Sequence, residues 1–245
     1  MEDCFEKVFG NKERVMVVMS HPDDAELYAG GTIARLTKSA KKVRVVKMSS
    51  GECGSRQENI SQEALGKLRE AEDRKAMEIL GIKNEDNVYL NLGDGKIENN
   101  LENIGKLAYQ IREFKPNLII THNPEHVVIR FKKDENWVNH RDHMNTALTT
   151  IYAAYPYSRD LLFYPEHFKN KNLISWSCTE FLLVDYYDHP DLVTIAIDDT
   201  VETRIKAHAS HASQYTEKHA QDAADYFTLQ EDGKRFEKFR YIIAD

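Results

Sequence analysis

Short apolar runs alternate with longer segments of helical periodicity through the first half of the chain. Residues 15–20 (VMVVMS), 43–48 (VRVVKM), 87–90 and 117–121 (NLIIT) are short, and most are rich in β-branched side chains. Such runs are typical of strands that are buried on both faces. Residues 25–39, 62–80 and 101–114 instead place apolar side chains at helical spacing, and Gly81 is expected to end the second of these helices. The alternation predicts right-handed βαβ units around a parallel sheet.

The second half continues this pattern less regularly. It predicts a helix from His140 to about residue 155, strands at 181–185 and 193–197, a helix over 198–215 and a weaker helix over 217–239. No repeat or Pro/Ser-rich linker divides the chain, so residues 1–245 are predicted to form one domain. The predicted fold class is α/β, with a Rossmann-like, mostly parallel sheet, helices on both faces and antiparallel edge strands near the C-terminus.

Composition and charge exclude several classes of protein. Of the 245 residues, 41% are hydrophobic and 30% are charged, which is an ordinary balance for a soluble globular protein. The net charge of -7 and the lack of a basic stripe argue against a nucleic-acid partner. No apolar run is long enough for a membrane span, and the N-terminus does not resemble a signal peptide. The three cysteines are widely separated and form no CxxC pair, so neither a disulfide framework nor a thiolate metal site is expected: Cys4, Cys53 and Cys178. A reducing, cytoplasmic location is therefore predicted. A homo-oligomer is possible on this sequence.

The first candidate for chemistry is His21-Pro22-Asp23-Asp24, which directly follows the predicted strand at 15–20. Sites in open α/β sheets form beyond the carboxyl ends of strands. Proline and acidic residues also begin helices, so a simple helix start is the alternative interpretation. Histidine, however, is a poor N-cap, and two adjacent carboxylates concentrate negative charge that a divalent cation would offset. An imidazole and one carboxylate are ligands that zinc accepts, and the second carboxylate remains available as a base.

The second candidate is His140-Arg141-Asp142-His143, which opens a helix after the predicted strand at 117–121. Residues three apart lie on one face of a helix, so both imidazoles can point to one place. Asp142 lies between them and is expected to orient one imidazole by a hydrogen bond. A pair of surface histidines is the alternative interpretation. Because both candidates follow strands of one parallel sheet, we expect them to meet at the same edge.

The motifs together resemble the PIG-L / LmbE-like family of zinc deacetylases. This family includes N-acetylglucosaminyl-phosphatidylinositol deacetylases and the deacetylases of bacillithiol and mycothiol synthesis. The resemblance rests on these segments: HPDD followed by the paired glycines Gly30 and Gly31, LREAEDRKAMEILG (68–81), KPNLIITH, HRDH and HASQY. It implies a zinc-dependent hydrolase that removes the acetyl group from an N-acetylglucosamine-type conjugate, a small-molecule substrate.

Carried over position by position, the resemblance implies three zinc ligands: His21, Asp24 and His143. Fe²⁺ is the alternative metal. Asp23 would be the general base that activates water, and His140 would stabilise the tetrahedral intermediate and assist the leaving amine. Arg69 would contact the substrate or the intermediate, with a helix ion pair to Asp73 as the alternative interpretation. One departure is Arg141, since the family often has proline at this position of the motif.

Other polar residues carry weaker signals. Residues 50–56 lack the lysine and the glycine spacing of a phosphate-binding loop, and they are expected to form a pocket wall. His122 and His126 could line the same pocket, although Pro124 argues against a helix that would align them as a second metal site. The histidines of the late helices are expected to be solvated or packed: His208, His211 and His219. Two other functions stay open: a zinc amidase that cleaves a larger amide, such as a thiol conjugate, and a non-catalytic sugar- or nucleotide-binding module.

Overall fold

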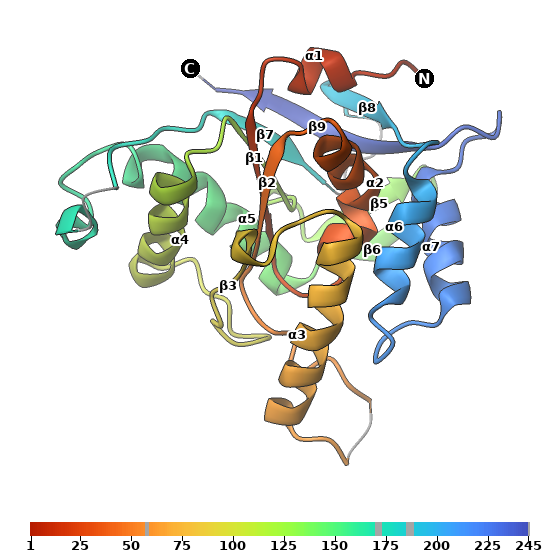
Figure 1. The fold of residues 1–245 in the computed structure, drawn as a ribbon, viewed down its shortest axis with the longest axis horizontal. Helices are drawn as coiled ribbons and strands as arrows, with labels where there is room; N and C mark the ends of the chain where they lie inside the picture. Colours follow the sequence, from red (N-terminus) through yellow and green to blue (C-terminus); the bar gives the residue numbers. More distant parts are fainter. Residues whose placement is uncertain (57–58, 170–172, 185–188, 245) are drawn as a thin grey trace.

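A seven-stranded sheet lies at the centre of the computed structural model, which describes residues 1–56, 59–169, 173–184 and 189–244 (Figure 1). The strand order is β3-β2-β1-β4-β7-β9-β8. The first five strands in this order run parallel, as the sequence predicts: β3 (Asn87–Tyr89), β2 (Lys42–Lys47), β1 (Arg14–Met19), β4 (Leu118–Thr121) and β7 (Glu180–Leu183). Asp185, the predicted end of β7, lies outside the described residues.

Antiparallel strands complete the sheet near the C-terminus, as expected. Strand β9 (Phe236–Ile243) pairs with both β7 and β8 (Leu192–Ala196), so β8 is the edge strand and β9 lies inside the sheet. The prediction of a helix over 217–239 is wrong in its second half, because α7 (Glu217–Thr228) ends before a turn at Gly233 and β9 follows. Phe236 and Phe239 are buried in β9. Their burial and the pairing of this segment with β8 outweigh the helix propensity of the charged residues between them.

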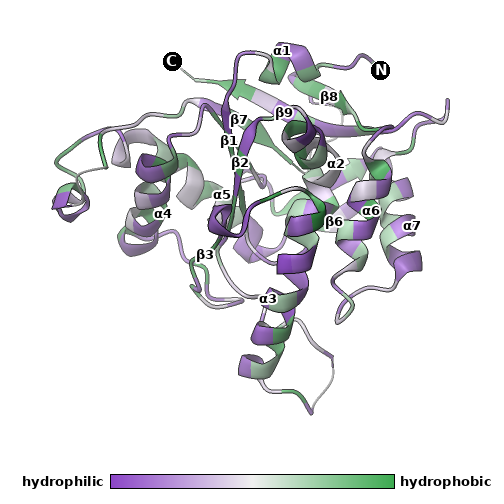
Figure 2. Cartoon of the chain, viewed as in Figure 1, coloured by the Kyte–Doolittle hydropathy of each residue, from purple (hydrophilic) through white to green (hydrophobic). Residues whose placement is uncertain are grey.

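Helices cover both faces of the sheet (Figure 1). One face carries α1 (Phe5–Phe9), α2 (Asp24–Lys38), α3 (Gln62–Ile79), α6 (Val201–Ala209) and α7. The other face carries α4 (Leu101–Phe114) and α5 (Arg141–Tyr152). Along β1, Val15 and Val17 lie in one core and Met16 lies in the other, as expected for a strand that is buried on both faces. Hydrophilic residues predominate along the outer helix α3 (purple in Figure 2).

Several local segments differ from the sequence-based expectation. The helix expected to reach residue 155 ends at Tyr152 and is followed by the irregular turn Ala153–Tyr157, and the helix expected over 198–215 is the shorter α6. The hairpin of β5 (Val128–Lys132) and β6 (Glu135–Val138) was not predicted. Short 3₁₀ helices lie at Asn84–Asp86 and Pro165–Lys169. Among the described residues, no helix combines the length and the apolar character that crossing a membrane requires.

The paired glycines of α2 allow close packing of the C-terminal elements against this helix. A Cβ on Gly30 would lie 2.9 Å from the Arg204 side chain of α6, and one on Gly31 would lie 2.8 Å from Ile197. The buried carboxylate of Glu237 in β9 accepts the backbone N–H groups of Gly31 and Thr32 at 2.8 and 2.7 Å. Helix α2, which begins at Asp24, is therefore held in position by hydrogen bonds to β9.

Candidate metal centre and active site

His21, Asp24 and His143 come together at the carboxyl edge of the sheet. His21 follows β1, Asp24 begins α2, and His143 lies in the first turn of α5. The Asp24 carboxylate lies 3.4 Å from Nδ1 of His21 and 3.3 Å from Nε2 of His143, and one ligand atom from each residue lies within 4.8 Å of the others. Two imidazoles and a carboxylate are donors that zinc accepts, and three protein ligands leave a coordination position open. The donor set therefore fits one divalent cation.

The electrostatics of Asp24 also favour a cation. Burial alone would raise the pKa of this carboxyl group, but the imidazoles of His143 and His122 hold it well below its usual range. The carboxylate is therefore anionic in a largely buried position, next to the second buried carboxyl group of Asp23. A buried anionic group of this kind is commonly stabilised by metal coordination or by an ion pair.

The second ring nitrogen of His21 faces two carboxylates. Nε2 lies 3.2 Å from Asp94 and 3.5 Å from Asp142, whose carboxylate also accepts the Gly95 N–H at 2.7 Å. Burial would lower the pKa of His21, but the carboxylates of Asp142, Asp24 and Asp94 raise it well above its usual value. Histidine ligands of metals normally donate their second N–H to such a group. Asp142 therefore lies where it can orient an imidazole, as does Asp94, which the sequence analysis missed.

Asp23, the predicted base, has an unusual backbone conformation. Its backbone φ is 97°, a conformation that residues other than glycine rarely adopt. Strain of this kind concentrates at functional sites, where the surrounding structure must hold it in place. Burial raises the pKa of Asp23, and the Arg69 guanidinium opposes that rise. The carboxyl group therefore binds a proton more readily than an exposed aspartate does.

Arg69 is buried and holds the segment around Asp23. Its guanidinium donates to Asp23 at 2.8 Å, to the Pro22 carbonyl at 2.7 Å and to the Gly51 carbonyl at 2.8 Å. The alternative of a helix ion pair between Arg69 and Asp73 is wrong, because Asp73 pairs with the buried Lys47 at 2.8 Å. The structure places Arg69 beside the candidate base, and the contact with substrate stays a prediction.

Gly51→Ala tests whether this arrangement matters. Both Gly51 and Gly233 have positive φ, but a Cβ on Gly51 would collide with the Arg69 guanidinium, whereas one on Gly233 would have no neighbour within 4 Å. We expect Gly51→Ala to lower the free energy of unfolding by about 1–2 kcal/mol more than Gly233→Ala. It should also lower kcat by roughly tenfold, because Arg69 must move away from Asp23. Urea unfolding and steady-state kinetics of the purified variants measure the two effects, and equal behaviour of both variants would contradict this role of Arg69.

His140 lies at the rim of the site and precedes α5 as its N-cap. Its Nδ1 accepts the backbone N–H of Asp142 at 3.2 Å, so the proton of the neutral imidazole resides on Nε2. The ring centroid lies 5.1 Å from that of His21 and 5.3 Å from that of His143. Burial, together with His21, lowers the pKa of His140 and favours the neutral form. The residue therefore begins the helix and also lies beside the metal-binding group.

His122 is more central than the sequence analysis expected. It is fully buried, lies 3.3 Å from Asp24 and stacks on His143 with ring centroids 3.9 Å apart. Its Nε2 accepts the Ser20 N–H at 3.2 Å, which engages the lone pair that a metal would need. Burial lowers the pKa of His122 to about 3, so the ring is neutral. His126 is exposed, with its Nε2 3.8 Å from Glu125.

The histidines of the late helices are packed or solvated, as expected. His208 and His211 are fully buried, whereas His219 is exposed. His211 lies 3.1 Å from the buried Glu26; burial would lower its pKa, but Glu26 raises it to about 8. Together with Asp73 these two residues form a second group of candidate metal donors. The His211–Glu26 contact and the Lys47–Asp73 pair already compensate its negative charge, so this group requires no cation.

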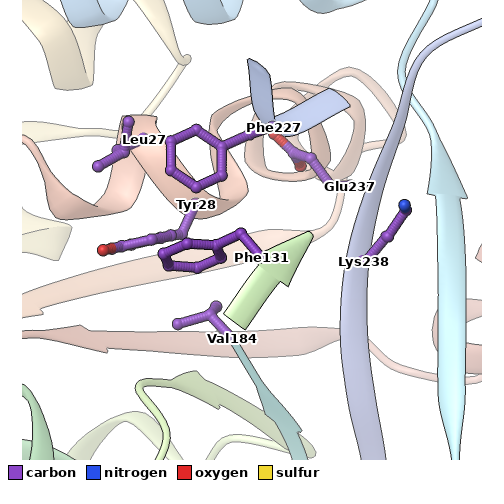
Figure 3. A pocket seen from close by; sticks show the side chains of 7 residues that line it. All are labelled: Leu27, Tyr28, Phe131, Val184, Phe227, Glu237 and Lys238. Carbon is purple, nitrogen blue, oxygen red and sulfur yellow. The ribbon is translucent and has the colours of Figure 1, made fainter. Parts of the chain in front are cut away.

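A small pocket beside Tyr28 has aromatic and aliphatic walls together with the charged residues Glu237 and Lys238 (Figure 3). Its volume is about 40 Å³, and its walls include Leu27, Tyr28, Phe131 and Phe227. The Tyr28 ring lies 6.2 Å from the ring of His143 and stacks against Phe131 at 6.0 Å. The side of the site near His143 is therefore aromatic and has little free space.

Comparison with known proteins finds several deacetylases that are similar to this chain. The diacetylchitobiose deacetylase of Thermococcus kodakarensis is 25% identical over 219 residues, which cover 85% of this chain and 73% of that protein. A probable N-acetyl-alpha-D-glucosaminyl L-malate deacetylase 2 of Bacillus anthracis is 28% identical over 217 residues, covering 85% and 84%. The structure of the N,N'-diacetylchitobiose deacetylase from Pyrococcus horikoshii shares the fold, with a TM-score of 0.81 at 22% identity, over 98% of this chain and 87% of that one. The family model for GlcNAc-PI de-N-acetylases matches residues 16–154, more than half of the 245 residues, and the chain therefore belongs to the PIG-L family.

Proposed function

We propose that this protein is a metal-dependent N-deacetylase that removes the acetyl group from an N-acetylglucosamine-type conjugate. The observation that carries the proposal is the convergence of two imidazoles and a carboxylate beside the strained, buried Asp23. Membership of the family and the printed activities of the relatives support the same reaction. The residues that would hold the cation are His21, Asp24 and His143. Zn²⁺ suits this mixed nitrogen and oxygen donor set, with Fe²⁺ as the alternative.

The side chains of the site have complementary roles in hydrolysis of the amide. A bound cation would polarise the amide carbonyl and lower the pKa of water. Asp23 accepts the proton of the attacking water and delivers it to the amide nitrogen, so that the C–N bond breaks to give acetate and a free amine. His140 donates from Nε2 to the developing oxyanion, a contribution of roughly 3–4 kcal/mol for one good donor.

The surrounding polar residues orient these groups. Asp94 and Asp142 lie 3.2 and 3.5 Å from Nε2 of His21, where they can accept its second N–H and orient the ring. Arg69 holds the Asp23 carboxylate and the preceding carbonyl group, which preserves the strained turn. Direct contact of Arg69 with substrate remains an additional prediction.

The proposal also covers the domain organisation, the cellular location and the oligomeric state of the enzyme. We propose one domain over residues 1–245, because a single sheet carries the helices of both faces. Free Cys4, Cys53 and Cys178 support a reducing, cytoplasmic location. Light scattering of the purified protein measures whether it forms homo-oligomers.

The test combines metal analysis with a screen of substrates. We expect about one divalent cation per chain and equal amounts of acetate and primary amine released from at least one N-acetylglucosamine conjugate. Chelation should abolish this activity, and Zn²⁺ should restore it. A metal-containing protein that cleaves only larger amides, such as a thiol conjugate, would support the amidase alternative. Protein that purifies without metal and hydrolyses no amide would support the binding module.

A further inference from the structure

A polar cleft of about 610 Å³ adjoins the candidate active site. It lies between the loop after β2 and the loop that joins α6 to α7. Its walls include Ser55 and Arg56 from the first loop and Ser213, Gln214 and Tyr215 from the second. The first loop is the segment that the sequence analysis expected to be a pocket wall. A cleft of this volume accommodates a ligand of disaccharide size.

Two contacts connect this cleft to the catalytic groups. Tyr215 interacts with Asp23, whose negative charge, together with burial, raises the pKa of the phenol. On the opposite wall, the N–H of Cys53 donates to Asp94 at 2.9 Å, and the other oxygen of Asp94 lies 3.2 Å from His21. The cleft is therefore connected to the candidate base through Tyr215 and to His21 through Asp94, on the side where the amine part of a bound amide can leave the site.

The lining of the cleft carries one kind of charge. Arg56 is the only charged residue that lines it within the described part of the chain, and the other walls present hydroxyl, amide and thiol groups. The Arg56 side chain is exposed, and no ion pair joins it to another described residue. A guanidinium group forms bidentate hydrogen bonds with carboxylates and phosphates. The polar walls suit the hydroxyl groups of a sugar, and Arg56 suits an anion attached to it.

The opposite side of the site is much smaller. The pocket beside Tyr28 has a volume of about 40 Å³, and Glu237 and Lys238 lie among its otherwise apolar walls, so it has room for no more than a small group (Figure 3). An acetamide has a methyl group at one end and the polar sugar at the other. Because only the cleft has room for a sugar, the conjugate is placed there and the methyl group toward the ring of Tyr28.

We propose that the cleft binds the amine-side conjugate of the substrate and that Arg56 pairs with an anionic group, a carboxylate or a phosphate, on that conjugate. The inference rests on the proposed deacetylase function and narrows its substrate class. Among the compounds named for the relatives, it favours an anionic one such as N-acetylglucosaminyl L-malate over the uncharged diacetylchitobiose.

The experiment compares Arg56→Gln with a variant that loses the same charge elsewhere. Arg74→Gln is the matched control, because Arg74 is half exposed on α3, pairs with Glu70 and does not line the cleft. The substrates are N-acetylglucosaminyl L-malate, N-acetylglucosamine 1-phosphate and diacetylchitobiose. We expect Arg56→Gln to lower kcat/KM for an anionic substrate, relative to diacetylchitobiose, by about fivefold to tenfold through KM. Arg74→Gln should leave this ratio unchanged, and high salt should reduce the difference between wild type and Arg56→Gln.

The possible results separate this inference from the proposed function. A selective effect on the malate conjugate identifies a carboxylate as the partner of Arg56, and a selective effect on the phosphate identifies a phosphate. Equal effects of Arg56→Gln on all substrates, or none, would overturn the inference, while acetate release would still support the deacetylase. If no substrate releases acetate, the proposed function fails. Calorimetry with the amine product, glucosaminyl L-malate, then tests the cleft alone: weaker binding to Arg56→Gln supports the anion contact, and unchanged binding refutes it.

Discussion

Asp23→Asn is expected to lower kcat by roughly 10²–10⁴-fold while the protein keeps its metal, because the change removes a general base and no ligand. Asparagine has the same shape as aspartate and also tolerates positive φ, so the strained backbone at this position should persist. Arg69 can still donate to the amide oxygen. The loss should therefore fall on proton transfer and leave the fold unchanged.

The pH profile gives a second measurement of the same variant. The working base is the deprotonated carboxylate, so wild-type kcat should fall as the pH drops through the pKa of Asp23, which burial raises. The Asp23→Asn protein should lack this acidic limb. Asp24→Asn is the matched comparison, since it removes the neighbouring charge but is expected to release the metal. Metal loss in Asp23→Asn and retention in Asp24→Asn would mean that the two aspartates have exchanged roles.

His143→Ala is expected to lose the metal and, with it, nearly all turnover. The substitution removes one of three converging donors and leaves His21 and Asp24 alone. Removing a residue that only hydrogen-bonds to a metal ligand weakens metal binding by about 10–100-fold. Removing a ligand itself should therefore weaken metal binding by more than this. Elemental analysis after dialysis measures occupancy. Added Zn²⁺ should raise the Tm of the wild type but not that of the variant, because only the wild type binds it in the folded state.

His126→Ala is the matched control for this experiment. His126 is exposed, lies in the neighbouring loop after β4 and faces Glu125. The control should retain its metal and its Zn²⁺-dependent Tm. Full metal occupancy of His143→Ala under the same conditions would remove His143 from the ligand set.

The parallel half of the fold was predictable because its signals are local. The runs at 15–20 and 117–121 are apolar without alternation, and their carboxyl ends must lie together in a parallel sheet. That rule alone brings His21 near His143 before any coordinates are known. The candidate ligand and base residues were predicted from such short-range patterns and from the family resemblance.

The remaining features depend on partners that are distant in sequence. Phe236 and Phe239 lie three residues apart, as on one face of a helix, and pairing with β8 makes residues 236–239 a strand. Asp94 follows a three-residue strand in a glycine-containing turn, so its approach to His21 has almost no periodic signal. Arg69 could not be paired from spacing alone, because Asp73 lies one helical turn away and Asp23 is distant in sequence. In each case a tertiary contact outweighs the local preference.

The interior position of β9 has a consequence for the order of folding during synthesis. Among the strands that the structure describes, edge strand β8 pairs with β9 alone, and β9 also supplies Glu237, which accepts two N–H groups of α2. A nascent chain that lacks residues 236–243 can form the β1–β4 sheet with the metal ligands, but β8 then has no neighbouring strand and α2 lacks two hydrogen bonds. Residues 236–243 leave the ribosome after every segment that supplies the candidate metal ligands. The sheet strands β1 to β4 and these ligands can therefore assemble before Glu237 completes the attachment of α2.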